Sequence, residues 1–436
     1  MMDNKGINYK KTFFLLLLFV QMVEYPLFSI SEHFKVIDEA IALVSLLYLF
    51  FAKTISKAKF LHLEVIFLYC FGIVNIIGVI SNIVFRYQVL PAVLGDMAIF
   101  SKCLLGYFLS RFMLRGMDIS LLVKPILRFC KFFSVLLFTV LVTNLFLEVF
   151  PCYTDIRFWY SGNNSLFSSQ QLFFGHPTYL GSTCVMLISL MIGIKSKDKK
   201  NNIPYIILCG VVAISTFRFK VLAFLIICPV LIYYSVKNKR FSKIVLIIAV
   251  AAGLLFSYHQ IDYYYIDNSG FSRSILTRTS VSVANDHFPL GAGFGTYGSH
   301  QSGVYYSPVY KKYGLNKIWG LSLEYPEEIV DTYWPMIIGQ FGYFGLIFFS
   351  VFVIVLAVQI SKLAKLGYNY FYSSLALFGY ILISSTSESS FSQPFSVLFM
   401  YIIGMYTSQL SLTGEYEFEE DAQIKHIGIK SGIFYR

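Results

Sequence analysis

Charged residues are scarce in this chain. Asp, Glu, Lys and Arg make up 14% of its 436 residues, whereas 56% of the residues are hydrophobic. Soluble globular domains are about one quarter charged. The shortage of charge excludes an ordinary soluble enzyme and predicts a single polytopic membrane domain that covers residues 1–436.

The cysteines lack the spacing of a redox or metal site. The sequence has seven cysteines and no Cys-x-x-Cys pair, and all except Cys152 fall inside apolar segments. We therefore expect packing residues, with no disulfide framework, no metal site and no cofactor. A small-residue cleavage site is also missing after the basic, then apolar N-terminus, so this segment is interpreted as a retained first span.

The net charge of +11 does not indicate nucleic-acid binding. Lys and Arg occur in small clusters at the ends of apolar segments, and no soluble basic domain is present to carry such an interface. Clusters of this kind are typical of the cytoplasmic connectors of a membrane protein.

Apolar segments long enough to cross a bilayer recur about twelve times. They are residues 12–31, 36–52, 61–83, 91–114, 125–150, 178–194, 203–216, 219–236, 244–258, 334–360, 371–387 and 394–412. No fixed-period repeat accompanies them. The expected fold is an all-α integral membrane protein.

Basic residues alternate between the two sets of connectors. One set is rich in Lys and Arg, for example at residues 195–200 and 237–243, and the other is poor in them. The positive-inside rule then puts both termini in the cytoplasm. A large loop at 260–333, between the ninth and tenth spans, and a smaller one at 151–177 become extracytoplasmic. The acidic segment 413–436 becomes a solvated cytoplasmic tail.

Arg218 and Lys220 stand in a very short connector on the outer side. Such cations can extend their head groups from the apolar region to the interface. They can also bind phosphate, since the planar guanidinium donates several hydrogen bonds and keeps its charge at any pH. Two cations in so short an outer connector favour the second interpretation.

The large loop carries two further arginines, Arg273 and Arg278, five residues apart. That spacing does not place them on one helical face. They are candidates for a second contact to an anionic lipid carrier, or they are ordinary solvated residues.

A glycine-rich run, residues 289–298, follows the arginines. Gly293, Gly295 and Gly298 match Gly-x-Gly-x-x-Gly, but no βαβ pattern surrounds them, so a nucleotide site is not predicted. The physical expectation is a backbone that passes close to another group and uses positive φ angles, either as a tight turn or as the wall of a binding site.

The loop ends in carboxylates: Glu324, Glu327, Glu328 and Asp331. One of them can act as a general base on a sugar hydroxyl, and the others can pair with Arg273, Arg278 or Lys317. His176 precedes an outer span start and His300 lies in the large loop. Each is a candidate ligand contact or a hydrogen-bonding residue.

Ionisable residues within or near the spans need partners or a function. They are Glu24, Glu64, Asp96, Lys102 and Glu388. A proton pathway through them would indicate a transporter.

Together these features resemble the Wzy polysaccharide polymerase and O-antigen ligase superfamily. The resemblance covers nearly the whole chain in topology. Its motifs are Ser-Thr-Phe-Arg ending at Arg218, Arg278 ahead of the glycine run, Asp-Thr-Tyr-Trp starting at Asp331 before three glycines spaced by three, and the His-Pro pair at His176.

One position departs from the ligases of that superfamily. They typically have a His-Asn pair where this chain has Asp331 and Thr332, and the histidine is implicated in their catalysis. The difference favours a polymerase and argues against a histidine-based mechanism here.

The resemblance implies a GT-C-like glycosyltransferase in the bacterial cytoplasmic membrane. It would join oligosaccharide units carried on undecaprenyl diphosphate into a surface polysaccharide, next to a flippase and a chain-length regulator. Arg218 and Arg278, with Lys220 and Arg273, would bind the diphosphate, and Asp331 would act on the acceptor. His176, Gly293, Gly295 and Glu328 would line the substrate site. A ligase of the same superfamily and a lipid-linked oligosaccharide flippase remain the alternatives.

Overall fold

A computed structural model describes residues 4–56, 60–149, 160–161, 169–194, 199–237 and 272–412. These residues are mostly helical. The α-helices are α1 (Asn4–Met22), α2 (Glu24–Ile30), α3 (Ile37–Ser56), α4 (His62–Phe85), α5 (Leu90–Met113), α6 (Ser120–Val149), α7 (Pro177–Gly193), α8 (Ile203–Ser215), α9 (Phe219–Lys237), α11 (Ser272–Asp286), α12 (His300–Val304), α13 (Pro308–Lys312), α14 (Trp334–Lys362), α15 (Tyr368–Ser384) and α16 (Pro394–Thr407).

Short elements complete the description. The 3-10 helices are η1 (Glu32–Val36), η3 (Lys199–Asn202), η5 (Leu315–Lys317), η6 (Leu363–Lys365), η7 (Ser390–Ser392) and η8 (Ser408–Leu412). Strands β1 (Tyr160–Ser161) and β2 (Ser169–Gln170) pair antiparallel.

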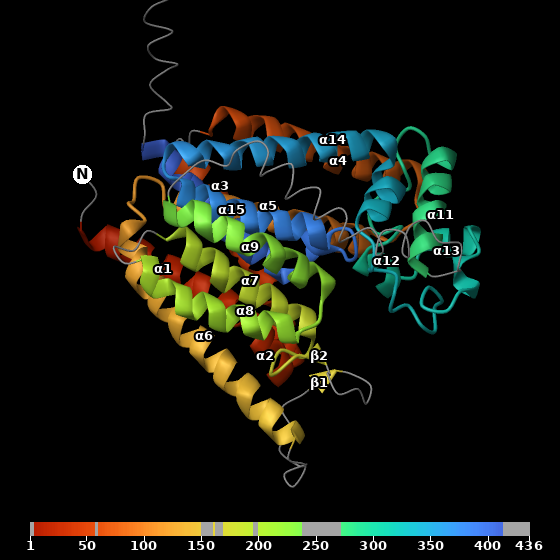
Figure 1. Cartoon of the computed structure of the whole chain (residues 1–436). Coiled ribbons are helices and arrows are strands. Elements are labelled where there is room, and N and C mark those ends of the chain that lie inside the picture. Colours follow the sequence, from red (N-terminus) through yellow and green to blue (C-terminus); the bar gives the residue numbers. More distant parts are fainter. Residues whose placement is uncertain are drawn as a thin grey trace, which may run out of the picture.

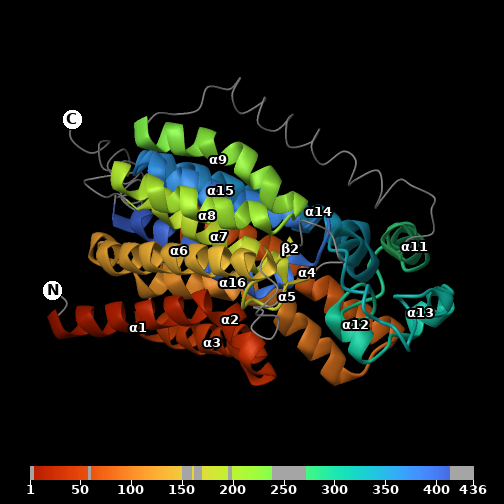
Figure 2. The same ribbon diagram turned by 60° about the horizontal axis from the view of Figure 1, so that its bottom comes forward.

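The long helices form a bundle, and α11, α12 and α13 lie together at one end of it (Figure 1; Figure 2). Residues 272–333, which contain these three helices, are called the cap. Hydrogen bonds tie other connectors together near the same end: Ser169 Oγ donates to the Thr216 carbonyl at 2.6 Å, and Ser389 Oγ to the Val330 carbonyl at 2.7 Å. Glu388, next to Ser389, pairs with Lys220 at the start of α9, so the turn between α8 and α9 lies at the cap end.

Several helices are suited to a membrane. Within the described ranges, four helices are long and apolar enough to cross a bilayer: His62–Phe85, Leu90–Met113, Ser120–Leu147 and Trp334–Lys365. The bent pair Tyr9–Met22 and Glu24–Ile30 would make a fifth span, and α7, α8 and part of α9 are shorter apolar helices. The all-α, membrane-embedded class is thus supported, while the count of about twelve spans stays a prediction. The predicted span 244–258 and the tail 413–436 lie outside the described residues.

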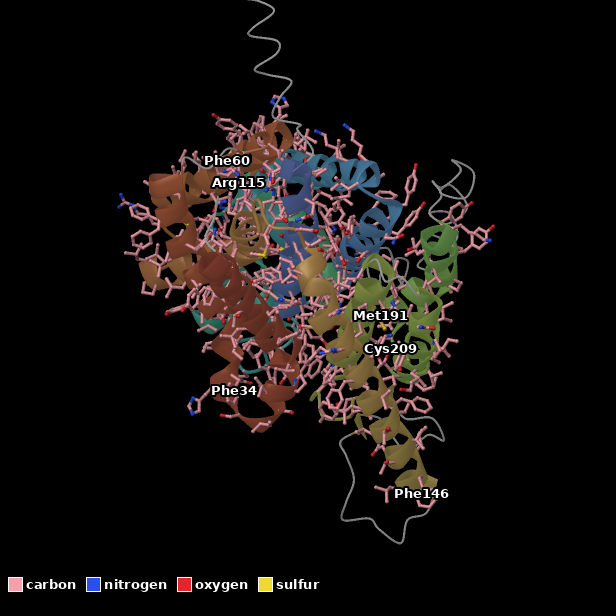
Figure 3. The ribbon with its side chains drawn as sticks, turned by 90° about the vertical axis from the view of Figure 1, so that its left-hand side faces the viewer. Phe34, Phe60, Arg115, Phe146, Met191 and Cys209 are labelled. Atoms are coloured by element: carbon pink, nitrogen blue, oxygen red, sulfur yellow. The ribbon has the colours of Figure 1, made fainter. Side chains whose placement is uncertain are left out.

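Apolar side chains point outward from the bundle as well as inward. Leu43, Leu46 and Leu47 of α3 are more than half exposed, as is Ile76 of α4. Figure 3 shows Phe146, near the end of α6, beyond the other helices, whereas Met191 of α7 and Cys209 of α8 lie inside the bundle. An outer surface of this kind is favourable in hydrocarbon and unfavourable in water. Six of the cysteines are buried and free, as expected of packing residues, and Cys152 lies outside the described residues.

The first predicted span, 12–31, is not one straight helix. It divides into α1 and α2 with a bend of 54° between them. Glu24 begins α2 and is 1% exposed, and its Oε1 accepts a hydrogen bond from the Asp38 amide at 3.1 Å. The bend therefore brings a buried carboxylate to the start of α3, which hydropathy alone did not indicate.

The glycine run joins the cap to the bundle. In α14, Gly342 has φ 64° and ψ −165°, which breaks the helix and leaves carbonyls available one turn earlier. The amides of Ala292 and Gly293 donate to the carbonyls of Gly339 and Gln340 at 2.9 and 2.8 Å. The expected close backbone approach with positive φ is confirmed at Gly293 (φ 99°).

The cap also has its own small apolar core. It contains Leu276, Val283, Ala292, Tyr297, Val309, Tyr310, Leu315, Leu321 and Ile329, all of them buried. The cap is consequently a packed unit seated on α14, and its helix α11 contacts that helix directly.

One intramembrane charge has a complete structural explanation. Glu64 and Arg111 are both fully buried and pair at 3.0 Å between α4 and α5. Tyr107 donates to the same carboxylate oxygen at 3.1 Å, and the Leu61 amide donates to the other at 2.8 Å. Since both oxygens of Glu64 are satisfied, it works as a helix cap and an interhelical tie.

Candidate functional site

A cavity of about 540 Å³ lies toward the cap end of the bundle. This volume is in the range of small-molecule binding sites, about 300–1,000 Å³. Its lining comes from α2, α3, α5, the start of α7 and the segment before it, the start of α12, Val330, the start of α14 and residues 389–394. Its ionisable lining residues are Asp38, Glu39, Asp96, Lys102, His176 and His300. Elements far apart in the sequence thus meet around one polar space.

A basic cluster borders this cavity. Lys220 Nζ pairs with Glu388 Oε1 at 2.5 Å, and Arg273 Nη2 pairs with Asp331 Oδ2 at 2.6 Å. Arg218 and Arg273 both act electrostatically on Lys220. Within the cluster, three cations thus face two carboxylates. The carboxylates adjoin the cavity along the chain, because Val330 and Ser389, each next to one of them, line it.

Burial and the ion pair with Arg273 act on Asp331 in opposite directions. Burial raises the pKa of this carboxyl group above its usual range, and the neighbouring Arg273 opposes the rise. One carboxylate oxygen accepts the guanidinium hydrogen bond. The pairing that the sequence left open is therefore present, and it holds Arg273 in a defined orientation.

Arg218 is set by a strained turn. Phe217, just before it, has φ 47°, which is uncommon for a residue other than glycine. The Arg218 carbonyl then accepts hydrogen bonds from the amides of Val221 and Leu222 at 2.9 and 3.0 Å, which starts α9. Such strain persists only where the surroundings enforce it. The turn places Arg218, with a half-buried side chain, at the cap end.

His176 lies between the cavity and the basic cluster. It lines the cavity and caps α7, where its Nδ1 accepts a hydrogen bond from the Thr178 amide at 3.2 Å. The neutral ring therefore carries its proton on Nε2. Burial, followed by the positive charges of Arg218 and Lys220, lowers the pKa of His176 to about 4. At neutral pH this histidine is an uncharged hydrogen-bond donor.

This state of His176 gives a pH prediction. The pKa is depressed below the usual value of about 6.5, so its contribution to stability is present above that value and is lost as pH falls toward 4. Nitrogen-15 NMR of labelled protein in nanodiscs should show the Nε2–H tautomer from pH 8 down to pH 5. His176→Gln should remove this part of the acid sensitivity of the melting temperature. A ring that titrates near pH 6.5 would contradict the assignment.

Some predicted site residues lie neither at the cavity nor in the basic cluster. Arg278 is exposed on α11, about 140° around the helix from Arg273. Gly293 packs on Asn82 of α4, and the Gly295 amide donates to Asp96 Oδ2 at 2.6 Å. Glu328 lies beside Gly320 in the cap and acts electrostatically on Asp331. The two glycines are thus structural, although Gly295 orients a carboxylate of the cavity.

Two carboxylates of the cavity were missed in the sequence. Asp38 and Glu39 stand in the first turn of α3, where acidic residues commonly stabilise a helix N-terminus. Their pattern is therefore uninformative by itself. The useful signal was Lys102, a cation inside an apolar segment, because a buried lysine requires an anionic partner. Asp38 supplies it, in an ion pair with Lys102.

No group of three or more His, Cys, Asp or Glu residues suited to a metal ion occurs in the part of the chain that the structure describes. Comparison of the sequence with protein-family models and with curated proteins finds no match.

Proposed function

We propose that this protein is a membrane glycosyltransferase that polymerises saccharide units carried on a polyprenyl diphosphate, with its site on the outer side of the bacterial cytoplasmic membrane. The observation that carries the proposal is the basic cluster of Arg218, Lys220 and Arg273 at the edge of a polar cavity. A polyprenyl diphosphate has the charge and the amphipathic form that such an interfacial cluster suits.

The distribution of basic residues supports the orientation. Arg115, Lys124 and Arg128 lie around the connector from α5 to α6, Lys362 ends α14, and Lys365 lies between α14 and α15. These connectors follow helices that start at the cap end, so they belong to the opposite end of the bundle (Figure 2). The positive-inside rule assigns that end to the cytoplasm and the cap to the outside. About twelve spans with both termini inside complete this topology.

Each cation has a role in the proposed reaction. Arg218 and Arg273 hold the diphosphate and stabilise the charge that grows on it as the glycosidic bond to the carrier breaks. Lys220 adds positive charge, and Glu388 keeps it in place. Asp331 orients Arg273. Arg278, exposed on another face of α11, is assigned no direct contact.

His176 links the two halves of the site. At neutral pH the ring is uncharged and takes no part in proton transfer. Its Nε2–H therefore suits a hydrogen bond to an oxygen of the diphosphate or of the attached sugar. This role as a neutral donor agrees with a mechanism in which no histidine is the base.

A reconstituted reaction tests the proposal. Purified protein in proteoliposomes is given lipid-linked repeat units from the source organism, with no lipid A and no protein acceptor. A polymerase should produce a ladder of longer lipid-linked chains on gels. The alternatives give different results: a ligase of the same superfamily should leave the units unextended, and a flippase should only move them across the bilayer. Unextended units together with transbilayer movement would refute the polymerase.

A further inference from the structure

The proposed function places the diphosphate at the basic cluster and leaves the cavity unassigned. The net charge of the cavity lining is negative, whereas that of the basic cluster is positive. The cavity lining contains three carboxylates, Asp38, Glu39 and Asp96, and one lysine, Lys102. A negative space in a low-dielectric surrounding repels a diphosphate. Its hydroxyl, carboxylate and imidazole groups, next to the rings of Phe174 and Tyr179, suit an uncharged saccharide.

Two of the three carboxylates are committed to structural contacts. Asp38 is 1% exposed, its Oδ2 pairs with Lys102, and its Oδ1 accepts from the Glu39 amide at 2.9 Å. Asp96 is 4% exposed and accepts from the Gly295 amide at 2.6 Å. Both carboxylates are almost fully buried and already accept hydrogen bonds, so they are less accessible to a substrate hydroxyl than Glu39 is.

Glu39 differs from both. Its side chain is 45% exposed, and its Oε1 lies 3.7 Å from Lys102 Nζ, beyond hydrogen-bonding distance. Its carboxyl group also has a side-chain hydrogen bond with Asp38, so exposure to the cavity is what distinguishes it. The nearby ammonium is already in closer contact with Asp38. Glu39 therefore presents an accessible carboxylate to the cavity, with a cation close enough to restrain it.

We propose that the cavity binds the acceptor saccharide and that Glu39 is the general base of the transfer. This inference rests on the proposed function. The attacking hydroxyl oxygen of the acceptor forms a bond to the anomeric carbon of the donor sugar as the bond from that carbon to the diphosphate oxygen breaks. The hydroxyl proton passes to the Glu39 carboxylate and then to water. The leaving group departs as polyprenyl diphosphate, held by the basic cluster.

The test compares Glu39→Gln with the wild-type protein in the proteoliposome reaction. Removing a general base should slow chain extension by about 100-fold or more. Binding of undecaprenyl diphosphate, measured separately in nanodiscs, should change by less than about threefold, because the diphosphate contacts are left intact. Glu39→Asp should recover part of the rate. Asp118→Asn, an exposed carboxylate in the connector between α5 and α6, is the matched control and should behave as wild type.

A pH profile of the rate distinguishes a catalytic role of Glu39 from a structural one. The rate of the wild type should rise with pH along a limb that Glu39→Gln lacks and Glu39→Asp retains. Glu39→Gln with near wild-type extension would overturn the inference, as would loss of diphosphate binding in both Glu39 variants, which would make Glu39 structural. Wild-type protein that extends no chains would refute the proposed function itself, a distinct result.

Discussion

Replacing Arg218 by alanine should slow chain extension by about 100- to 1000-fold, the loss usual when one donor to a developing charge is removed. The strained turn at Phe217 and the start of α9 depend on backbone contacts, which the substitution keeps. The melting temperature should therefore stay close to that of the wild type. Chain length on gels and single-turnover rates in proteoliposomes measure the effect.

Two other arginine variants test whether the effect of Arg218→Ala is specific to its guanidinium group and its position. Arg218→Lys keeps the charge but loses the planar fork of donors, so it should recover only part of the rate. Arg278→Ala is the matched control, because Arg278 is exposed and lies about 140° around α11 from Arg273, the α11 arginine of the basic cluster. Normal long chains in Arg218→Ala would refute the site. A loss in Arg278→Ala as large as that in Arg218→Ala would support the sequence-based expectation that both arginines bind the diphosphate.

The positions of the helices were largely predictable, because the bilayer imposes a long apolar run on each span. The predicted span 91–114 is α5, Leu90–Met113, and 334–360 is α14, Trp334–Lys362. Interruptions within a run were not predictable. The bend beside Glu24 and the break at Gly342 are stabilised by partners more than a dozen residues away, Asp38 and the glycine run.

Site residues were predictable from the sequence only where a charged residue stands among apolar ones. Arg218 and Lys220, two cations at the junction of two apolar segments, gave such a signal. Glu39 gave none, because a glutamate in the first turn of a helix is ordinary. Arg273 and Arg278 looked equivalent in the sequence. Only the packing of α11 on α14, which turns Arg273 toward Asp331, separates them.

The largest structural effect is expected at Gly291, where the cap meets the break in α14. A Cβ atom at Gly291 would lie 2.4 Å from the Gly342 amide nitrogen and 2.7 Å from the Gln340 carbonyl oxygen. These are backbone atoms, so they cannot rotate away as a side chain does. Moving the glycine run away from α14 would break the hydrogen bonds from Ala292 and Gly293 that attach the cap.

Gly291→Ala should therefore destabilise the protein by more than about 4 kcal/mol, at the upper end for single substitutions, and should release the cap to proteolysis. Gly314→Ala is the matched control: its φ of 71° is close to the 78° of Gly291, but nothing lies within 4 Å of its Cβ position. It should lose only the about 1–2 kcal/mol of left-handed strain. Thermal unfolding in detergent measures both. Equal losses in the two variants would mean that φ alone matters at Gly291. A much larger loss there would identify the backbone contact between residues 291 and 342 as the one that attaches the cap, which carries Arg273, to the bundle.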